Sequence, residues 1–212
     1  MRMSWSRFLL IAILPMVASC NLLTPLAVMG VHRKRIPPEF DKLAGTRVAV
    51  QVWTDPSTLF DYPYARLELA TYLGDKLHAE MGQRNQAVEV VDPRDVEDFL
   101  QKNPDARINP SAVGKRFKAN YVIYVEVASF QIRDPSEPQF LRGRINASVS
   151  VHDVSADARD ARRYELTPVE AVYPEEQPVL INATNSPLVR EATYRKFAEM
   201  VARKFYEYTI EL

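Results

Sequence analysis

Four carboxylates between positions 92 and 98 are the side chains best suited to acid and base chemistry: Asp92, Asp95, Glu97 and Asp98. Most glycoside hydrolases use two carboxylates that flank a groove, one as the acid and the other as base or nucleophile. Asp92 and Asp95 also suit the start of a helix, because negative charge there meets the positive end of the helix dipole. The helix interpretation is the simpler one, and a glycan hydrolase with Asp95 or Glu97 as the acid is an alternative.

Other patterns that support catalysis or cofactor binding are absent from the sequence. It has no nucleophile elbow, Walker loop, dinucleotide-binding fingerprint or His-Glu metal helix. Its three histidines, at positions 32, 78 and 152, are far apart, and a single cysteine cannot form an internal disulfide or a cysteine-based metal centre. Six glycines are too few and too dispersed for a phosphate cradle. We therefore expect no enzymatic activity, no metal and no cofactor.

The first 19 residues have the features of a signal peptide. Arg2 and Arg7 form a basic start, and residues 8–17 form an apolar run that is too short to span a bilayer. Residues 17–20, Val-Ala-Ser-Cys, resemble the lipobox of bacterial lipoproteins. This resemblance implies cleavage between Ser19 and Cys20 and attachment of palmitate and other acyl chains to Cys20, which would anchor the protein to a membrane.

Localisation and charge follow from that processing. By the same resemblance, Asn21 after the cysteine favours the outer membrane over the inner one, with the protein facing the periplasm. The whole chain has 27 basic and 27 acidic residues, so loss of Arg2 and Arg7 leaves 25 basic and 27 acidic. A balance near zero argues against a nucleic-acid partner, which would need a basic surface.

Residues 20–45 are expected to form the lipidated N-terminus and a flexible tether, since they include Pro25, Pro37 and Pro38 and lack regular periodicity. Fully extended, this segment reaches at most about 80 to 90 Å. Its basic triplet, residues 33–35, either contacts anionic lipid head groups or is simply solvated.

Residues 46–212 are expected to form a single α/β (α+β) domain, because regular hydrophobic patterns continue through this whole range. Alternation predicts strands, three- and four-residue spacing predicts helices, and Asp92-Pro93, Asn109-Pro110 and Ser186-Pro187 are helix starts. The predicted elements are strand 47–53, helix 64–81, strand 87–91, helix 93–100, helix 110–117, strand 120–132, strand 141–151, strand 162–173 and a final helix from 187. This β-α-β-α-α-β-β-β-α order predicts a mixed sheet of about five strands with helices packed on it.

Three strands carry further information about their positions. Strand 120–132 is apolar on both faces over most of its length, which is typical of a central strand. Strand 141–151 alternates, with Leu141, Gly143 and Ile145 facing inward and Arg142 and Arg144 facing outward. Pro168 places strand 162–173 at an edge or a bulge.

Two surfaces are candidate partner-binding sites. The loop after the first strand is rich in aromatic residues and follows a position where α/β folds often bind ligands. Its candidate residues are Trp53, Asp55, Phe60, Tyr62 and Tyr64. These rings either contact a partner or cover one end of the core. Arg142 and Arg144 lie in a polar strip that either meets a partner or is solvated.

The entry to the central strand, residues 119–127 with the sequence Ala-Asn-Tyr-Val-Ile-Tyr-Val-Glu-Val, resembles bacterial envelope proteins of the TolB amino-terminal, CsgG and LpoB type. Members of that group are mostly docking or regulatory modules, and some build secretion pores. The resemblance therefore implies a non-enzymatic accessory lipoprotein that docks onto an envelope complex for cell-wall synthesis, secretion or a Tol-like process. A CsgG-like oligomeric pore, with strand 141–151 inserted in the membrane, is an alternative, since this strand has the required length of roughly 9 to 11 residues.

Overall fold

The computed structural model describes residues 33–134, 136–154, 163–182 and 185–211. These residues belong to two compact units, one comprising Pro37–Tyr208 and a smaller one comprising the segments before Pro37 and after Tyr208. The predicted signal peptide, its cleavage point at Ser19 and the lipidated Cys20 lie outside the described residues. Among the residues that are described, no helix has both the length and the apolar character needed to cross a membrane.

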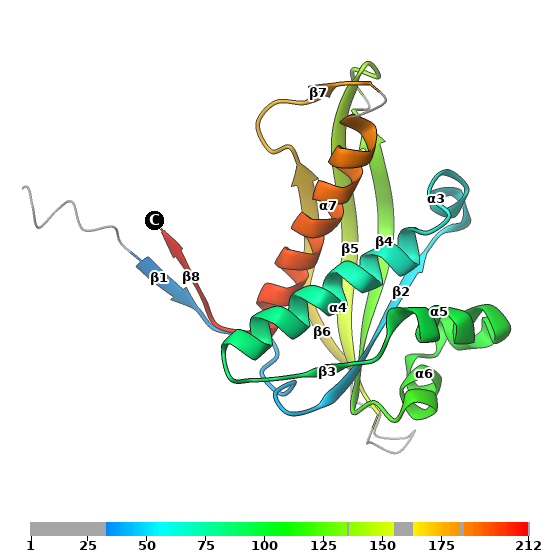
Figure 1. Cartoon of the computed structure of the whole chain (residues 1–212), viewed down its shortest axis with the longest axis vertical. Helices are drawn as coiled ribbons and strands as arrows, with labels where there is room; N and C mark the ends of the chain where they lie inside the picture. The colour runs from blue at the N-terminus through cyan, green and yellow to red at the C-terminus, as the bar shows by residue number, and fades with distance from the viewer. Residues whose placement is uncertain (1–32, 135, 155–162, 183–184, 212) are drawn as a thin grey trace, which may run out of the picture. The chain divides into compact units, whose positions relative to one another are not determined.

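The larger unit contains a six-stranded mixed sheet, so the predicted fold class is confirmed (Figure 1). Its path is β3-β2-β4-β5-β6, with β7 paired to β5 beyond that path. The strands are β2 Arg47–Thr54, β3 Glu89–Val90, β4 Tyr121–Arg133, β5 Phe140–Asp153, β6 Arg163–Tyr173 and β7 Val179–Leu180. β2 pairs in parallel with β3 and β4, whereas β4, β5, β6 and β7 pair in antiparallel fashion. As predicted, β4 is central and β6 lies at an edge with a register shift beside Pro168.

Helices cover the two faces of this sheet unequally. They are α3 Pro56–Asp61, α4 Ala65–Gln83, α5 Pro93–Lys102, α6 Pro110–Phe117 and α7 Asn185–Ala202, with 3-10 turns η2 Pro104–Ile108 and η3 Arg203–Phe205. Asp92 and Asn109 cap α5 and α6 by accepting hydrogen bonds from the backbone NH groups of Arg94 and Ala112. α4 and α7 pack on one face over most of the sheet, whereas α5, η2 and α6 cover the other face mainly near β2.

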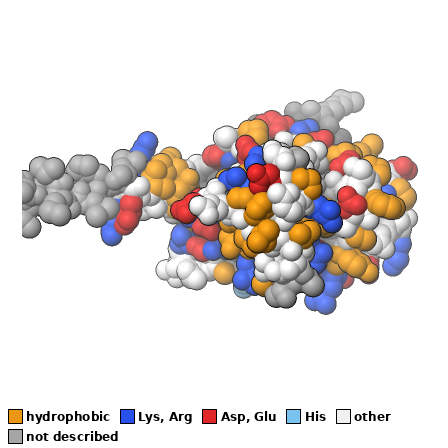
Figure 2. Space-filling view, turned by 90° about the horizontal axis from the view of Figure 1, so that it is seen from above, with side chains coloured by type: hydrophobic (Ala, Val, Ile, Leu, Met, Phe, Trp, Pro, Cys, Tyr) orange, Lys and Arg blue, Asp and Glu red, His pale blue; other side chains and the backbone are white. Residues whose placement is uncertain are grey.

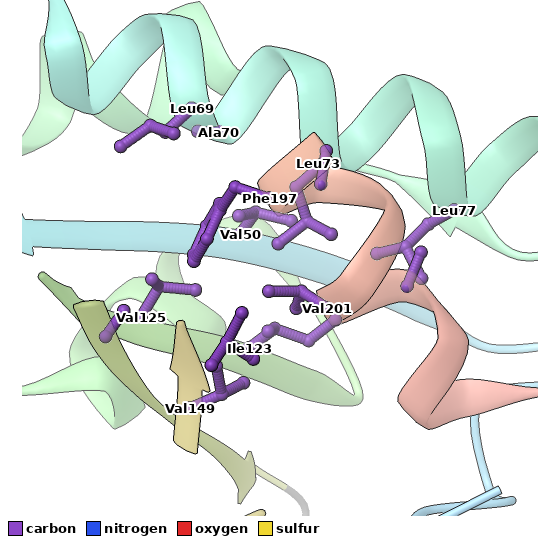
Figure 3. Close-up of a cluster of buried hydrophobic side chains, with 14 of the residues drawn as sticks. Val50, Leu69, Ala70, Leu73, Leu77, Ile123, Val125, Val149, Phe197 and Val201 are labelled. Atoms are coloured by element: carbon purple, nitrogen blue, oxygen red, sulfur yellow. The ribbon is translucent and has the colours of Figure 1, made fainter. Parts of the chain in front are cut away.

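The main core lies between the sheet and helices α4 and α7 (Figure 3). Leu69, Leu73 and Leu77 of α4 and Phe197 of α7 have almost no exposed surface. They point toward valines and isoleucines of the sheet, so the predicted apolar face of the long helix is confirmed. Burying a side chain of this kind contributes roughly 1.5 to 3 kcal/mol, and this layer therefore fixes the two helices on the sheet.

A smaller core under α5 and α6 contains Ala49 and Val122 from the second face of the sheet. Gln51 lies beside it with 1% of its surface exposed. Its side-chain nitrogen donates hydrogen bonds to the carbonyls of Ala106 and Arg107, at 3.2 and 2.8 Å. This polar contact positions η2 against β2 because it satisfies backbone groups that would otherwise be buried unpaired.

The predicted tether is too long at its C-terminal end. Phe40 and Leu43 are buried in the core, at 4% and 0% exposed surface. Glu39 accepts a hydrogen bond from the backbone NH of Thr167 and pairs with Lys204, at 2.7 and 2.8 Å. Residues 37–45 therefore belong to the domain, because two apolar side chains and a charged anchor in a segment without periodicity are enough to fix it.

The smaller unit contains a two-stranded sheet. β1, Arg33–Ile36, pairs with β8, Tyr208–Glu211, whose first residue still belongs to the larger unit. Neither strand is predicted from the sequence, since each is only four residues long and exists through its pairing with the other.

Candidate functional site

One end of the larger unit has a cleft of about 650 Å³, which we call the distal cleft. It lies between the end of α3, the turn that joins β4 to β5, and the segment that leads from β7 into α7 (Figure 1). Tyr62, Phe130, Ile132 and Leu141 supply its apolar lining, and Arg133 and Asp134 supply charge. The unit's own chain ends lie at the other end, where Glu39 and Phe40 bind the backbone of Lys204 just after α7.

Large apolar side chains are exposed on the segments that form the distal cleft. They are Phe60, Leu180, Ile181 and Leu188, with 88%, 62%, 39% and 57% of their surface exposed, and we call them the distal apolar patch. Figure 2 views this end and shows hydrophobic side chains gathered between charged ones. Large exposed apolar side chains that gather on one part of a protein surface often mark a site of interaction with another molecule.

Tyr62 and Phe60 have different roles although they are two residues apart. The ring of Tyr62 packs against Phe130 at 4.4 Å between centroids, and Phe130 packs against Tyr194 at 5.2 Å. Burial raises the pKa of the Tyr62 hydroxyl above its ordinary value. Tyr62 therefore covers the end of the core, whereas Phe60 is left on the surface.

Asp55 has a structural task in the candidate loop. Its carboxylate caps α3 by accepting hydrogen bonds from the backbone NH groups of Ser57 and Thr58, at 2.8 and 3.1 Å, and from both hydroxyls. The hydrogen bond from the Ser57 side chain, followed by those from Thr58, holds the pKa of Asp55 well below its ordinary value. Asp55 thus positions Phe60 and Tyr62 by starting the short helix that carries them.

The remaining two residues of the predicted loop site lie elsewhere. Trp53 is half-buried on β2, opposite Glu126 of β4. Tyr64 precedes α4 with 70% of its surface exposed and lines a separate cleft of about 170 Å³ with Arg66 and Glu97. The structure therefore does not bring all five predicted loop residues into one site.

Arg142 and Arg144 face away from the main core, as predicted, on the side of the sheet that α5 and α6 leave open. Both are half-buried rather than fully solvated. Arg142 donates a hydrogen bond to the carbonyl of Glu175. The Nε atoms of both arginines are buried and have no hydrogen-bond partner among the described residues. These residues form a polar surface next to the distal cleft, since Arg144 lies opposite Gln131 of β4, which lines that cleft.

The carboxylates at positions 92–98 are divided among three clefts: Asp92 lines one, Asp95 and Asp98 line a second, and Glu97 and Asp98 line a third. Asp92 caps α5 and pairs with Arg94, and Glu97 pairs with Arg66 at 2.7 Å, where both side chains are only 13% exposed. Asp95 lines a cleft of about 470 Å³ with Lys102 and Arg116, whereas Glu97 lines the cleft beside Tyr64. Residues two apart on a helix point in nearly opposite directions, so Asp95 and Glu97 cannot act on the same bond.

A further cleft of about 540 Å³ lies between α4, β3 and the start of α5. Asp75, His78, Glu89 and Asp92 are among its polar residues. Glu89 is paired with Arg47 and Asp92 with Arg94, so these two carboxylates are already occupied. Within the described residues, no group of three or more histidine, cysteine, aspartate or glutamate side chains is arranged to hold a metal ion.

The sequence interpretation missed three residues of the distal apolar patch. Leu180 and Ile181 lie in or beside β7, and Leu188 lies in the first turn of α7. The available signal was the run of three apolar residues 179–181 directly after Pro178, bounded by polar residues. The exposure of the side chains in this run could not be predicted from the sequence, because it depends on how β7 pairs with Phe140 and Leu141 of β5.

No protein-family model matches the sequence, and no curated protein matches it. Similar solved structures include a PelC dodecamer from Paraburkholderia phytofirmans, with 11% identity, a TM-score of 0.45, and coverage of 82% of this chain and 98% of that chain. Others are lipoprotein GNA1162 from Neisseria meningitidis, with 12% identity, a TM-score of 0.39 and coverage of 73% and 99%, and the hypothetical protein CT253 from Chlamydia trachomatis, with 16% identity, a TM-score of 0.40 and coverage of 74% and 94%. The similar structures thus include bacterial proteins and a lipoprotein, and at TM-scores below 0.5 they support no argument about what this chain does.

Proposed function

We propose that this protein is a periplasm-facing bacterial lipoprotein, anchored through Cys20 to the outer membrane, that acts as a non-enzymatic docking module for an envelope protein complex. Its domain binds a protein partner through the distal apolar patch and the distal cleft. The complex is one of cell-wall synthesis, secretion or a Tol-like process, in line with the resemblance of residues 119–127 to the TolB amino-terminal, CsgG and LpoB type.

The observation that carries this proposal is the position of the distal apolar patch. Phe60, Leu180 and Leu188 are more than half exposed, and each lies within two residues in sequence of a residue that lines the cleft. The lining combines apolar side chains with the charged Arg133 and Asp134. The elements that carry the three exposed side chains, α3, β7 and the start of α7, lie away from the chain ends of the larger unit (Figure 1). A lipid anchor holds the chain from the N-terminal side, so the patch is free to meet a partner while the protein stays attached.

The two alternatives fit the structure less well. In a pore, the inward-facing side of strand 141–151 would have to contact lipid, but Leu141 and Ile145 are completely buried beneath α7 and are needed for the core. In a glycan hydrolase, two carboxylates must flank one bond, but Asp95 and Glu97 line different clefts. Asp98 shares a cleft with each of them, but it belongs to the same helix and does not face them across a groove.

The lipid anchor is tested by growing cells with labelled palmitate. The full chain should carry the label, and Cys20→Ser should lose it while the folded domain remains. A labelled Cys20→Ser variant, or an unlabelled full chain at normal expression, would contradict the anchor.

The docking surface is tested by placing a photoreactive residue at Phe60 or Leu188, with Lys115 on α6 as an exposed control position. Both distal positions should crosslink to the same envelope protein and the control should not. Leu180→Asp should reduce the crosslink from Phe60 several-fold without changing the unfolding transition, because Leu180 is 62% exposed. Equal crosslinking from Lys115, or no effect of Leu180→Asp, would contradict the proposed surface.

A further inference from the structure

β1 and β8 form a small two-stranded sheet (Figure 1). Its short strands carry exposed charged side chains. Arg33, Lys34 and Arg35 of β1 are exposed, as are Thr209 and Glu211 of β8. The two strands are joined by an ion pair between Arg33 and Glu211, with 3.6 Å between nitrogen and oxygen. The side chains of this pair are 69% and 68% exposed.

By itself, this two-stranded sheet has little to stabilise it. Two strands of four residues form a marginal structure in water, and a stable sheet normally needs a third strand or an apolar layer on one face. An exposed ion pair adds at most about 1 kcal/mol. A further strand on a free edge would supply the missing stabilisation.

The free edges of the small sheet are suited to strand addition. Within the described residues, β1 has only β8 as a neighbour and β8 has only β1. Each strand therefore has one edge whose backbone NH and carbonyl groups are not used in the sheet, and such edges readily pair with another chain.

We propose that copies of this chain associate through the small sheet, with the free edge of β1 in one copy pairing with the free edge of β8 in the next. The charges on the strands favour this arrangement. β1 carries three cationic side chains, and β8 carries the carboxylate of Glu211. Pairing β1 with β1 would place like charges opposite each other, which is destabilising. Pairing β8 with β8 would bring no cationic side chain to Glu211. Only β1 with β8 places opposite charges together.

The arrangement has a consequence for the size of the assembly. Because the two edges differ, each added copy leaves one β1 edge and one β8 edge unused, so association continues until a ring closes or a filament forms. A complex of only two copies would leave half of the edges unpaired. The association is separate from the distal apolar patch and does not depend on the proposed docking function.

The first experiment identifies which edges meet. Two differently tagged full chains, both carrying Cys20→Ser, receive Lys34→Cys in one and Thr209→Cys in the other, so that each has a single thiol. After purification in detergent, mixing and mild oxidation, the disulfide between positions 34 and 209 should form at least several-fold more than either homodimer. Mainly 34–34 or 209–209 disulfides, or none of the three, would overturn the proposal.

The second experiment measures assembly mass by light scattering after gel filtration. The Cys20→Ser chain should have a mass more than twice that of one copy. Arg33→Glu with Arg35→Glu should reduce it to one copy, and adding Glu211→Arg should restore the larger mass by reversing both charges. Lys115→Glu with Lys118→Glu, on exposed positions of and beside α6, is the matched control and should leave the mass unchanged.

Two results of the second experiment would overturn the proposal. One is a mass of a single copy for the Cys20→Ser chain at all concentrations. The other is an unchanged mass for the chain with Arg33→Glu and Arg35→Glu. If this chain also binds more weakly to vesicles that contain phosphatidylglycerol, the basic residues bind lipid head groups instead. An unfolding curve equal to that of the parent chain shows that the substitutions leave the domain folded.

Discussion

Gly143 of β5 lies directly against Thr193 of α7, and no side chain fits between them. A Cβ atom at this position would lie 2.8 Å from the Cβ of Thr193 and closer still to its hydroxyl oxygen, which hydrogen-bonds the carbonyl of Val189 at 2.6 Å. We predict that Gly143→Ala lowers the free energy of unfolding by about 1 to 3 kcal/mol, because the strand or the helix must move. Urea denaturation of the purified domain measures this change.

Gly82 of α4 provides the matched control for Gly143. It is exposed, and an added Cβ atom would have no neighbour within 4 Å. Gly82→Ala should leave stability unchanged or raise it by up to about 1 kcal/mol, since alanine favours a helix. If Gly143→Ala were as well tolerated as Gly82→Ala, the close packing of α7 on β5 would be refuted.

His152 makes stability depend on pH. Burial, followed by the nearby charge of Arg163, lowers the pKa of its imidazole below the ordinary value of 6.5, while Glu165 has the opposite effect. Between the lowered pKa and 6.5 the unfolded chain binds more protons than the folded one, so stability should decrease as the pH falls below about 6.5. Unfolding measured between pH 7.5 and pH 5.5 should show this decrease.

The same pH series on His152→Gln separates His152 from other titrating groups. Glutamine keeps a polar group that can replace the contact between His152 Nε2 and Ser150 Oγ, which are 3.2 Å apart, but it does not titrate. The variant should therefore lose most of the decrease in stability between pH 6.5 and pH 5.5. Curves of equal slope for the parent chain and the variant would assign the pH dependence to other residues.

At the scale of elements, the packing of residues 37–45 determines where the domain begins, and a substitution at Phe40 tests this boundary. Phe40 is 4% exposed and makes edge-to-face contacts with Tyr121, Tyr164 and Phe205, at 5.3, 5.0 and 6.4 Å between ring centroids. We predict that Phe40→Ala lowers the free energy of unfolding by about 3 to 5 kcal/mol, the usual cost of truncating a buried ring. Chemical denaturation is again the measurement.

Phe60→Ala is the control for this prediction, since the same substitution is made at a ring that is 88% exposed. Its effect on stability should stay within about 0.5 kcal/mol. A small effect of Phe40→Ala would instead favour the original expectation that residues up to 45 form a flexible tether.

The long elements could be predicted because each has a regular hydrophobic pattern. The predicted helix 110–117 has the observed bounds, and the predicted strand 120–132 differs from β4 by one residue at each end. Both patterns can be recognised within a short stretch of sequence. The helix begins with a proline, and the strand is apolar on both sides near its start because both of its faces are covered. These elements were sufficient to predict the mixed sheet.

Short elements could not be predicted because distant contacts stabilise them. β7 has two residues and depends on pairing with β5, and β1 depends on β8, which is about 170 residues away in sequence. The candidate loop illustrates the same limit. Its aromatic composition indicated a special region, but only the packing of Tyr62 on Phe130 distinguishes the buried ring from the exposed Phe60.

At the scale of the whole molecule, the distance between anchor and docking surface follows from the corrected domain boundary. Only 12 residues, 21–32, separate Cys20 from β1, so the reach of this segment is at most about 40 Å instead of 80 to 90 Å. Within the larger unit, the 18 residues of α7 extend about 27 Å from the distal cleft toward the opposite end.

This geometry predicts that docking depends on tether length. Deleting residues 22–31 shortens the reach by about 33 to 36 Å while keeping Cys20, Asn21 and the whole domain. Under the proposed function, labelled palmitate should still be incorporated and the unfolding curve should not change, but the photocrosslink from Phe60 should fall several-fold.

Replacing the same ten residues by a glycine-serine segment of equal length should preserve the crosslink, because the proposal depends on the length of this segment and not on its sequence. If the crosslink survives the deletion, the partner lies next to the anchoring membrane. If the crosslink is lost in the glycine-serine variant of equal length, the partner recognises residues 22–31 themselves.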